Sequence, residues 1–305
     1  MLTYVLRRLV LAVLVIATVL VASFALTRLS GDVAIAIAGP NATAEDVAKI
    51  REENGLNRPL TEQFLTWAGA AATGDLGRSF LYRAPVGGLV RARLPVTLTL
   101  GCAGLLIALA VSLPLGILAA MAEGSVLDRA VMLVALVGQA IPSFWLGLLL
   151  IIWLGLDLQW LPIAGLDDWT GYILPAVTLA FSAIPALMRL ARSGMVDALA
   201  ADYIRTARAK GLSRASIVLK HALRNAAMPI VAIAAVQLGF MLGGSIVIEA
   251  VFNLPGLGYL AWESISKNDF PVVQAVVLIL AVIYVALTLA ADLLNAALDP
   301  RLRRA

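Results

Sequence analysis

The sequence predicts an all-α integral membrane protein built on six membrane-spanning helices. Hydrophobic residues make up 61% of the 305 residues and charged residues only 14%, whereas soluble domains have about half and about a quarter. The charged residues are also spaced so that six long uncharged windows remain, each with the roughly 20 residues that cross a bilayer: Leu9–Thr27, Leu94–Ala122, Ala130–Leu156, Trp169–Met188, Asn225–Ile248 and Phe270–Ala291.

The first window is expected to be an uncleaved span rather than a signal peptide. Arg7 and Arg8 precede it, as basic residues precede a signal sequence. Its apolar run is longer than the roughly 7–15 residues of a signal h-region, however. Residues 1–29 are therefore expected to form the N-terminus and the first span.

The connections between the windows predict the orientation in the membrane. Segment 189–224 carries eight basic and two acidic residues, whereas the connection between the third and fourth windows carries three aspartates and no base. The positive-inside rule places segment 189–224 in the cytoplasm. With six spans, both termini then face the cytoplasm, including the tail 299–305, and the hydrophilic segment 30–93 lies outside.

The outer segment balances seven acids against seven bases and contains two predicted helices. Thr43 is placed to cap the first helix, because acidic residues follow it at once, and Asn54-Gly55 is a typical helix end. A second short helix is expected after Pro59, through Trp67.

Two sites interrupt the helical pattern near the spans. Pro142 lies in the third window, where a break is tolerated if neighbouring helices satisfy the freed backbone groups. After the fifth window, residues 252–258 (FNLPGLG) are too rich in turn formers to stay helical and too apolar for a free loop. We expect this stretch to fold back against the outer mouth.

The stretch 202–224 predicts two short helices joined by a tight turn. Asp202 is placed to cap a helix that runs to Lys210, and Gly211 to end it in a left-handed conformation. Ser213 is placed to cap a second helix through His221. Apolar residues give the unit one face, and its arginines and lysines give it a positive face.

Two simpler accounts explain this stretch less well. A nucleic-acid-binding helix-turn-helix needs a supporting domain, and a unit of about 35 residues tethered between two spans has none. Topology and binding to anionic lipid headgroups explain the positive charge, but not Gly211 and the capping residues around it.

The stretch resembles the cytoplasmic coupling motif of ATP-binding cassette (ABC) importer permeases, a helix pair that sits in a groove of the ATPase. The family pattern is E-A-A, three residues, Gly, nine residues and I-x-L-P. The corresponding residues here are Arg205-Thr206-Ala207, Gly211 and His221-Ala222-Leu223-Arg224. The forms RTARAKGL and HALRNA are those of the peptide and nickel branch of these permeases.

Other stretches carry the same resemblance over essentially the whole chain. They are GDLGRS (74–79), RLPVTLTL (93–100), IPSFWLG (141–147), LPAVTLA (174–180), EAVFNLPGLG (249–258), DFPVVQ (269–274) and ALDPRLR (297–303).

The resemblance implies a type-I ABC importer permease fold, with the permease domain at 94–298, in a bacterial inner membrane. It implies four kinds of partner: a second related permease subunit, two ATPase subunits that hold ATP and Mg²⁺, an external solute-binding protein, and a di- or oligopeptide or a nickel chelate as solute. It also implies that the ATPase contact is made by Asp202, Tyr203, Arg205, Ala207, Arg208, Ala209, Lys210, Gly211 and Leu212.

The sequence lacks the residues for several other functions. None of its four lysines follows a glycine, so the chain has no P-loop and ATP is expected to be hydrolysed by a partner. An intramembrane serine protease needs a base near a buried serine, and the one histidine, His221, lies in the basic segment. The six windows contain no acid or histidine, which argues against a proton- or sodium-driven carrier.

Uncharged polar residues remain as candidates for lining a hydrated path through the spans. Each of them has a competing role in helix-packing hydrogen bonds. Glu249, at the outer end of the fifth window, is expected to face solute or a partner, or to be an ordinary interfacial acid. The candidates are Gln139, Ser143, Thr178, Ser182, Gln237, Ser245 and Glu249.

Overall fold

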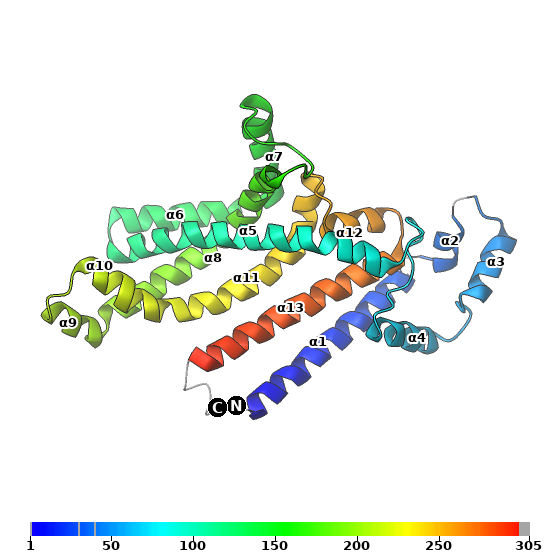
Figure 1. The fold of residues 1–305 in the computed structure, drawn as a ribbon, viewed down its shortest axis with the longest axis horizontal. Helices are drawn as coiled ribbons and strands as arrows, with labels where there is room; N and C mark the ends of the chain where they lie inside the picture. The colour runs from blue at the N-terminus through cyan, green and yellow to red at the C-terminus, as the bar shows by residue number, and fades with distance from the viewer. Residues whose placement is uncertain (1, 30, 40, 299–305) are drawn as a thin grey trace.

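Five long helices lie side by side and form the body of the molecule (Figure 1). The structure is a computed structural model that describes residues 2–298 apart from residues 30 and 40. Each of the five is long and apolar enough to cross a membrane, which confirms the predicted all-α membrane class. They are α1 (Leu2–Leu29), α5 (Val86–Met121), α8 (Ile173–Ala200), α11 (Leu223–Val251) and α13 (Phe270–Leu298).

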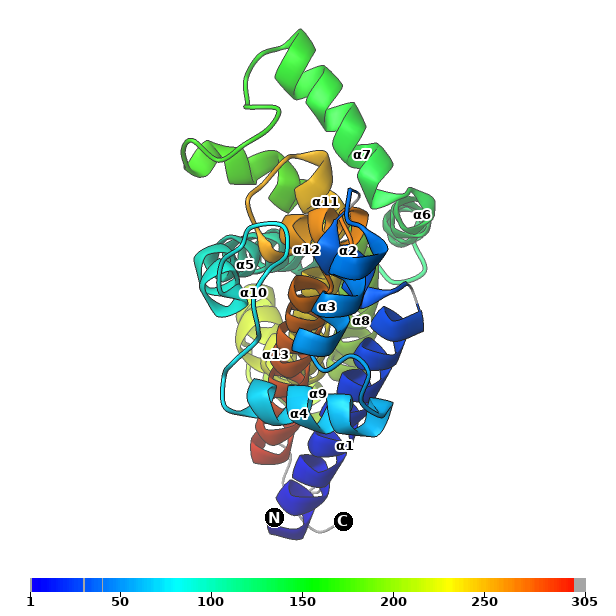
Figure 2. The same cartoon turned by 90° about the vertical axis from the view of Figure 1, so that its right-hand side faces the viewer.

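The third predicted span is broken in two. Helix α6 (Val126–Ala140) ends before Pro142, and α7 (Ser143–Leu150) continues through the π-helical turn η1 (Ile151–Asp157). The two halves meet at an angle of 95°, and the half that contains α7 leaves the direction of the long helices in both views (Figures 1 and 2), although α7 still packs against α8 and α11. The residue before a proline avoids the helical conformation, and Ile141 is extended at φ −81°, ψ 122°. The described residues give six spans when this bent pair counts as one.

The centre of the bundle is the contact between α5 and α8. A Cβ at Gly116 would lie 2.7 Å from the Ala191 Cβ and 2.8 Å from the Met188 carbonyl oxygen, so only glycine lets the two backbones approach this closely. A similar glycine brings α11 against α13, since a Cβ at Gly239 would lie 2.4 Å from the Tyr284 ring. These contacts bury the apolar core around Leu100, Leu179 and Leu187.

One end of the bundle, called the basic end here, carries two short helices. These are α9 (Asp202–Ala209) and α10 (Arg214–Ser216), and the chain continues through the π-helical segment η3 (Ile217–Ala222) directly into α11. The start of α1 and the end of α13 meet toward the same end, where Arg8 Nη1 lies 2.6 Å from Asp292 Oδ2. The expected second helix through His221 is thus not separate from the fifth span.

The opposite end carries the segment between α1 and α5. It contains α2 (Val33–Ala38), α3 (Ala44–Glu53) and α4 (Leu60–Ala72), shown toward the viewer in Figure 2. Thr43 caps α3 in a reciprocal capping box with Asp46, and the chain leaves that helix through Gly55 at φ +62°. Helix α4 follows Pro59, so both helices predicted in this segment are confirmed.

The stretch after α11 contains a helix that the sequence analysis does not predict. Only residues 252–256 form the turn, and α12 (Leu257–Ser266) begins at once. The stretch packs against the bundle, because Leu254 and Leu257 have no exposed surface, and its predicted place at the outer mouth stays a prediction. A 3-10 turn, η2 (Trp169–Tyr172), begins the fourth span. The predicted tail 299–305 lies outside the described residues.

Candidate coupling site and translocation path

Helix α9 and the segment η3 dock on the bundle through an apolar face, whereas α10 has no buried residue. Ile204 has no exposed surface and Ala207 is 6% exposed, and both pack with Ile217 and Val218. Their partners on the long helices include Ala120 at the end of α5. This core holds the short helices against the ends of the spans and leaves their other face outward.

The outward face consists of the residues predicted to contact an ATPase. All of them except Ala207 are exposed, and Arg205 keeps 77% of its side-chain surface while it pairs with Asp202. The buried Ala207 contributes to the docking core instead. The exposed residues of the predicted set are Asp202, Tyr203, Arg205, Arg208, Ala209, Lys210, Gly211 and Leu212.

The turn between the two helices follows the predicted chemistry with one correction. Gly211 has φ +73°, the left-handed conformation that was predicted, and Ser213 accepts a hydrogen bond from the Ser216 backbone N–H at 3.3 Å. Asp202 is not the cap, because Ala201 holds that position and Asp202 is the first helical residue. An acid in the first turn still interacts favourably with the helix dipole.

A groove of about 740 Å³ lies beside this unit. One wall comes from the end of α8 and from the turn after α5, including Glu123. The other wall is formed by Arg208 and Arg214 together with the apolar residues Leu212 and Ile217. The groove therefore combines an apolar floor with two cationic side chains at the basic end.

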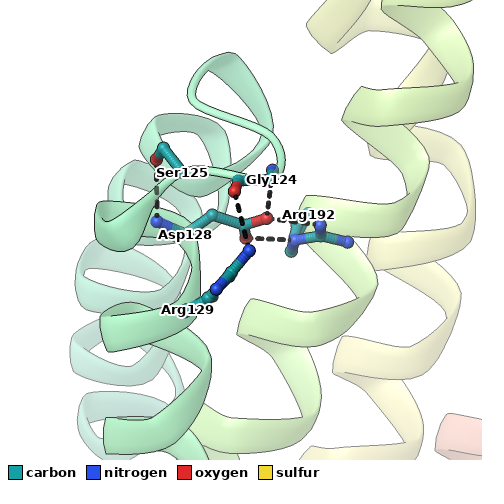
Figure 3. A network of polar contacts seen from close by, with 5 residues as sticks. All are labelled: Gly124, Ser125, Asp128, Arg129 and Arg192. Carbon is teal, nitrogen blue, oxygen red and sulfur yellow. Dashed lines mark hydrogen bonds and ion pairs between the residues drawn. The ribbon is translucent and has the colours of Figure 1, made fainter.

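An ion pair that the sequence does not predict joins α6 to α8 next to this groove. Arg192 donates from Nε to Asp128 Oδ1 at 2.5 Å and from Nη2 to Oδ2 at 2.7 Å (Figure 3). The Gly124 backbone N–H donates to Asp128 Oδ2 at 2.9 Å, and the Asp128 N–H donates to Ser125 Oγ at 3.3 Å. The pair joins the start of α6 to the beginning of the last third of α8. In the sequence, the Ser-x-x-Asp spacing at 125–128 is typical of a helix start, and it is the signal that could have drawn attention to Asp128.

The seven candidate path residues do not form one continuous surface in this structure. Thr178, Ser245 and Glu249 have no exposed surface. Thr178 donates to the Leu174 carbonyl oxygen at 2.7 Å, a helix-internal bond. These observations support the competing helix-packing account for the three buried residues.

The other four candidates have side chains that are at least partly exposed. Gln139 accepts a hydrogen bond from Arg189 Nη1 at 2.8 Å, and the exposed Ser182 donates to the Leu179 carbonyl oxygen at 2.8 Å. Ser143 and Gln237 are half-buried. A path role stays a prediction for Gln139, Ser143, Ser182 and Gln237.

Glu249 is the centre of a buried hydrogen-bond cluster at the opposite end. Its carboxylate accepts from Thr97 Oγ1 at 2.7 Å, from Ser245 Oγ at 3.0 Å and from the Tyr259 N–H at 2.9 Å. Thr97 Oγ1 in turn accepts from the Leu257 N–H at 2.7 Å. The cluster ties α5, α11 and α12 together, so Glu249 faces neither solvent nor the interface in this structure.

A second acid, Asp269, holds the loop before α5. Its carboxylate accepts from the Ser79 hydroxyl and from the backbone N–H groups of Phe80 (3.0 Å) and Leu81 (3.2 Å). The nearby Tyr82 hydroxyl donates to Glu263, and burial together with that contact raises the pKa of Tyr82 to about 12. Asp269 begins the DFPVVQ stretch and Ser79 ends GDLGRS, so these two stretches contact each other.

The amino-acid sequence of the chain is similar to those of known transport proteins. The family model described as "Binding-protein-dependent transport system inner membrane component" matches residues 112–304, and the model of its N-terminal part matches residues 1–101. The glutathione transport system permease protein GsiC of Escherichia coli O6:H1 is 42% identical over 305 residues, and that of Salmonella typhimurium is 43% identical. Each alignment covers 99% of both chains.

The fold is also similar to that of solved transporters. An inward-facing structure of the MetNI methionine ABC transporter superposes with a TM-score of 0.58 at 21% sequence identity, over 69% of this chain and 96% of that chain. A second crystal form of the same transporter gives the same score at 22% identity. At this identity the similarity concerns the fold alone.

Proposed function

Because the chain belongs to the family of binding-protein-dependent transport system inner membrane components, we propose that it carries small peptides through the inner membrane as one permease subunit of an ATP-driven importer. Its membership makes it a multi-pass ABC importer permease. The peptide substrate rests on one observation, the 42–43% identity over the full chain to glutathione permeases. Glutathione is itself a small peptide, which places it in the predicted solute class.

The proposed assembly contains a second permease, two ATPase subunits that hold ATP and Mg²⁺, and a solute-binding protein on the outer side. The exposed face of α9 and α10 is the contact with the ATPase in this proposal. It is positively charged, rigidly backed by the Ile204–Ala207 docking core and turned at Gly211. With this face in the cytoplasm, both termini are cytoplasmic and α2 to α4 are outside.

The mechanism proposed is alternating access. Closure of the ATPase pair moves α9 and α10, and the apolar core formed by α9 and η3 passes the movement to the ends of α5 and α8. The continuous path from α10 through η3 into α11 provides a second connection, because no loop absorbs the movement. The spans then reopen to the other side and release the solute.

Uptake by the purified assembly in liposomes tests the substrate class. We expect ATP-dependent uptake of glutathione or of a dipeptide in the presence of the binding protein, and none of free Ni²⁺ at the same concentration. Uptake of a nickel chelate, without uptake of either peptide, would identify the nickel chelate as the solute instead. Uptake by this chain alone without ATP would instead support a secondary carrier.

A further inference from the structure

A polar pocket lies where α1 ends against the turn between α3 and α4. Its volume is about 380 Å³, and its walls come from Arg28 in the last turn of α1, from Glu53 and Asn54 at the end of α3, and from Arg58 and Gln63. None of these residues belongs to the coupling site or to the predicted path. The pocket is therefore a separate feature of the opposite end.

Two buried polar atoms in this pocket have no hydrogen-bond partner among the described residues. They are Arg28 Nε, a donor, and Gln63 Oε1, an acceptor. The orientation of the Gln63 amide is fixed, because its Nε2 donates to the carbonyl oxygens of Leu56 at 3.1 Å and Arg58 at 2.8 Å. Buried polar groups are nearly always paired, so a ligand that both accepts and donates would complete the pocket.

The available guanidinium donors of the pocket favour an anion. The Arg28 guanidinium lies 5.1 Å from the Phe24 ring centroid, and no ion pair of the described residues includes it. Arg58 shares one Nη with Glu62 at 2.9 Å and keeps 62% of its side-chain surface. Arg28 Nε has no partner within the described part of the chain and Arg58 uses only one Nη on Glu62, so both guanidinium groups still have donors for an oxyanion, and guanidinium groups match phosphate geometry well.

The position of the pocket indicates where the anion comes from. Arg28 directly follows the uncharged window of the first span, which is the depth of the lipid headgroups. Helix α4 crosses this end of α1, anchored by Trp67, whose ring lies 6.0 Å from that of Phe24, and it exposes Leu60 (60%) and Leu65 (68%). Exposed leucines and a tryptophan on one short helix are typical of a helix that lies in the membrane interface.

We propose that this pocket binds the phosphate of a phospholipid headgroup from the adjacent leaflet, with the phosphate on Arg28 and Arg58. A headgroup ammonium or hydroxyl then donates to Gln63 Oε1, with Glu53 beside it. Phosphatidylethanolamine carries a phosphate and an ammonium and is therefore the probe of choice. The bound lipid joins α1 to the α3–α4 turn and so fixes the outer segment at the membrane surface.

Photolabelling tests the site without any transport measurement, so the result is independent of the proposed function. The purified assembly is incubated with phosphatidylethanolamine that carries a photoreactive headgroup, and the labelled peptides are mapped by mass spectrometry. Labelling is expected within residues 53–70. Arg28→Gln and Arg58→Gln should each reduce it about tenfold, the factor that corresponds to about 1.4 kcal/mol, whereas Arg91→Gln, at an exposed arginine outside the pocket, should not.

Arg58→Gln keeps the test decisive if the Arg28 variant fails to fold, because the Arg58 side chain is largely exposed. Equal labelling in the wild type and the Arg58→Gln protein would overturn the proposal. Inorganic phosphate and glutathione are added as competitors, and neither is expected to displace the lipid at equal concentration. Displacement by either one would assign the pocket to a soluble anion and overturn the lipid source.

Discussion

Arg192 and Asp128 form a two-point ion pair that joins α8 to the start of α6, with N–O distances of 2.5 and 2.7 Å. Parallel donation by one guanidinium to both oxygens of a carboxylate fixes orientation as well as distance. The pair lies next to the groove lined by Arg208 and Arg214, because Ser125, at the start of the same helix as Asp128, also lines that groove. It therefore holds α6 and α8 together next to that groove.

Replacement of Arg192 by lysine tests that role. Lysine keeps the charge but cannot make the two-point contact, so Arg192→Lys should lower the thermal unfolding temperature of the purified chain and reduce ATP-driven uptake several-fold. Arg129→Gln is the matched control, because Arg129 makes only a 3.5 Å contact with the Gly124 carbonyl oxygen. Equal losses of unfolding temperature and uptake in both variants would show that the two-point ion pair is not needed for stability or transport.

Gly211→Val tests the turn between α9 and α10. A Cβ there meets nothing within 4 Å, so the penalty comes from the left-handed backbone alone, roughly 1–2 kcal/mol. We expect the variant to reach the membrane in normal amount and to lose uptake. Gly211→Asn is the control, since asparagine tolerates this conformation, and it should retain most of the activity. Normal uptake by Gly211→Val would contradict the coupling role of the turn.

Gly256→Ala tests the packing around the Glu249 cluster. The new Cβ would lie 2.3 Å from Glu249 Oε2 and 2.7 Å from Thr97 Oγ1, although the backbone conformation itself suits alanine. The variant should unfold at a distinctly lower temperature. Gly244→Ala adds the same methyl group where nothing lies within 4 Å, so its unfolding temperature should not fall; comparable destabilisation by both would refute the steric explanation.

Removing the Glu249 carboxylate separates its packing role from a path role. In Glu249→Ala the Thr97 hydroxyl and the Tyr259 N–H lose their acceptor, at roughly 1–3 kcal/mol each, whereas the Ser245 hydroxyl still reaches the Leu242 carbonyl oxygen at 2.9 Å. Ser182→Ala, at an exposed candidate, should leave stability unchanged. If Glu249→Ala were as stable as the wild type and changed only the solute preference, Glu249 would be a path residue and the cluster account would be wrong.

Most of the fold could be predicted because the bilayer imposes one rule on the spans. Charges are excluded from about 20 consecutive residues, and that exclusion located all six windows. The exact shape of the third span could not be predicted. Pro142 signals a break, but whether the helix continues straight or turns by 95° depends on what packs beside it.

The candidate site was predictable where local chemistry decides it. Gly211 and Ser213 determine the turn by their own backbone and side-chain preferences, as the sequence predicts. The contacts of Glu249 could not be found this way, because its partner Thr97 lies 152 positions earlier in the chain. Helix α12 was missed because the turn formers at 253–256 dominate the pattern just before it.

ATP-dependent uptake by the reconstituted assembly tests whether this chain imports solute only together with its ATPase partners. The purified chain is placed in liposomes with and without its co-purified permease and ATPase partners, and labelled glutathione is supplied with the binding protein. We expect uptake only with the partners and ATP, and its loss when Gly211→Val replaces the wild-type chain. Uptake by this chain alone, unaffected by ATP and by Gly211→Val, would contradict this expectation.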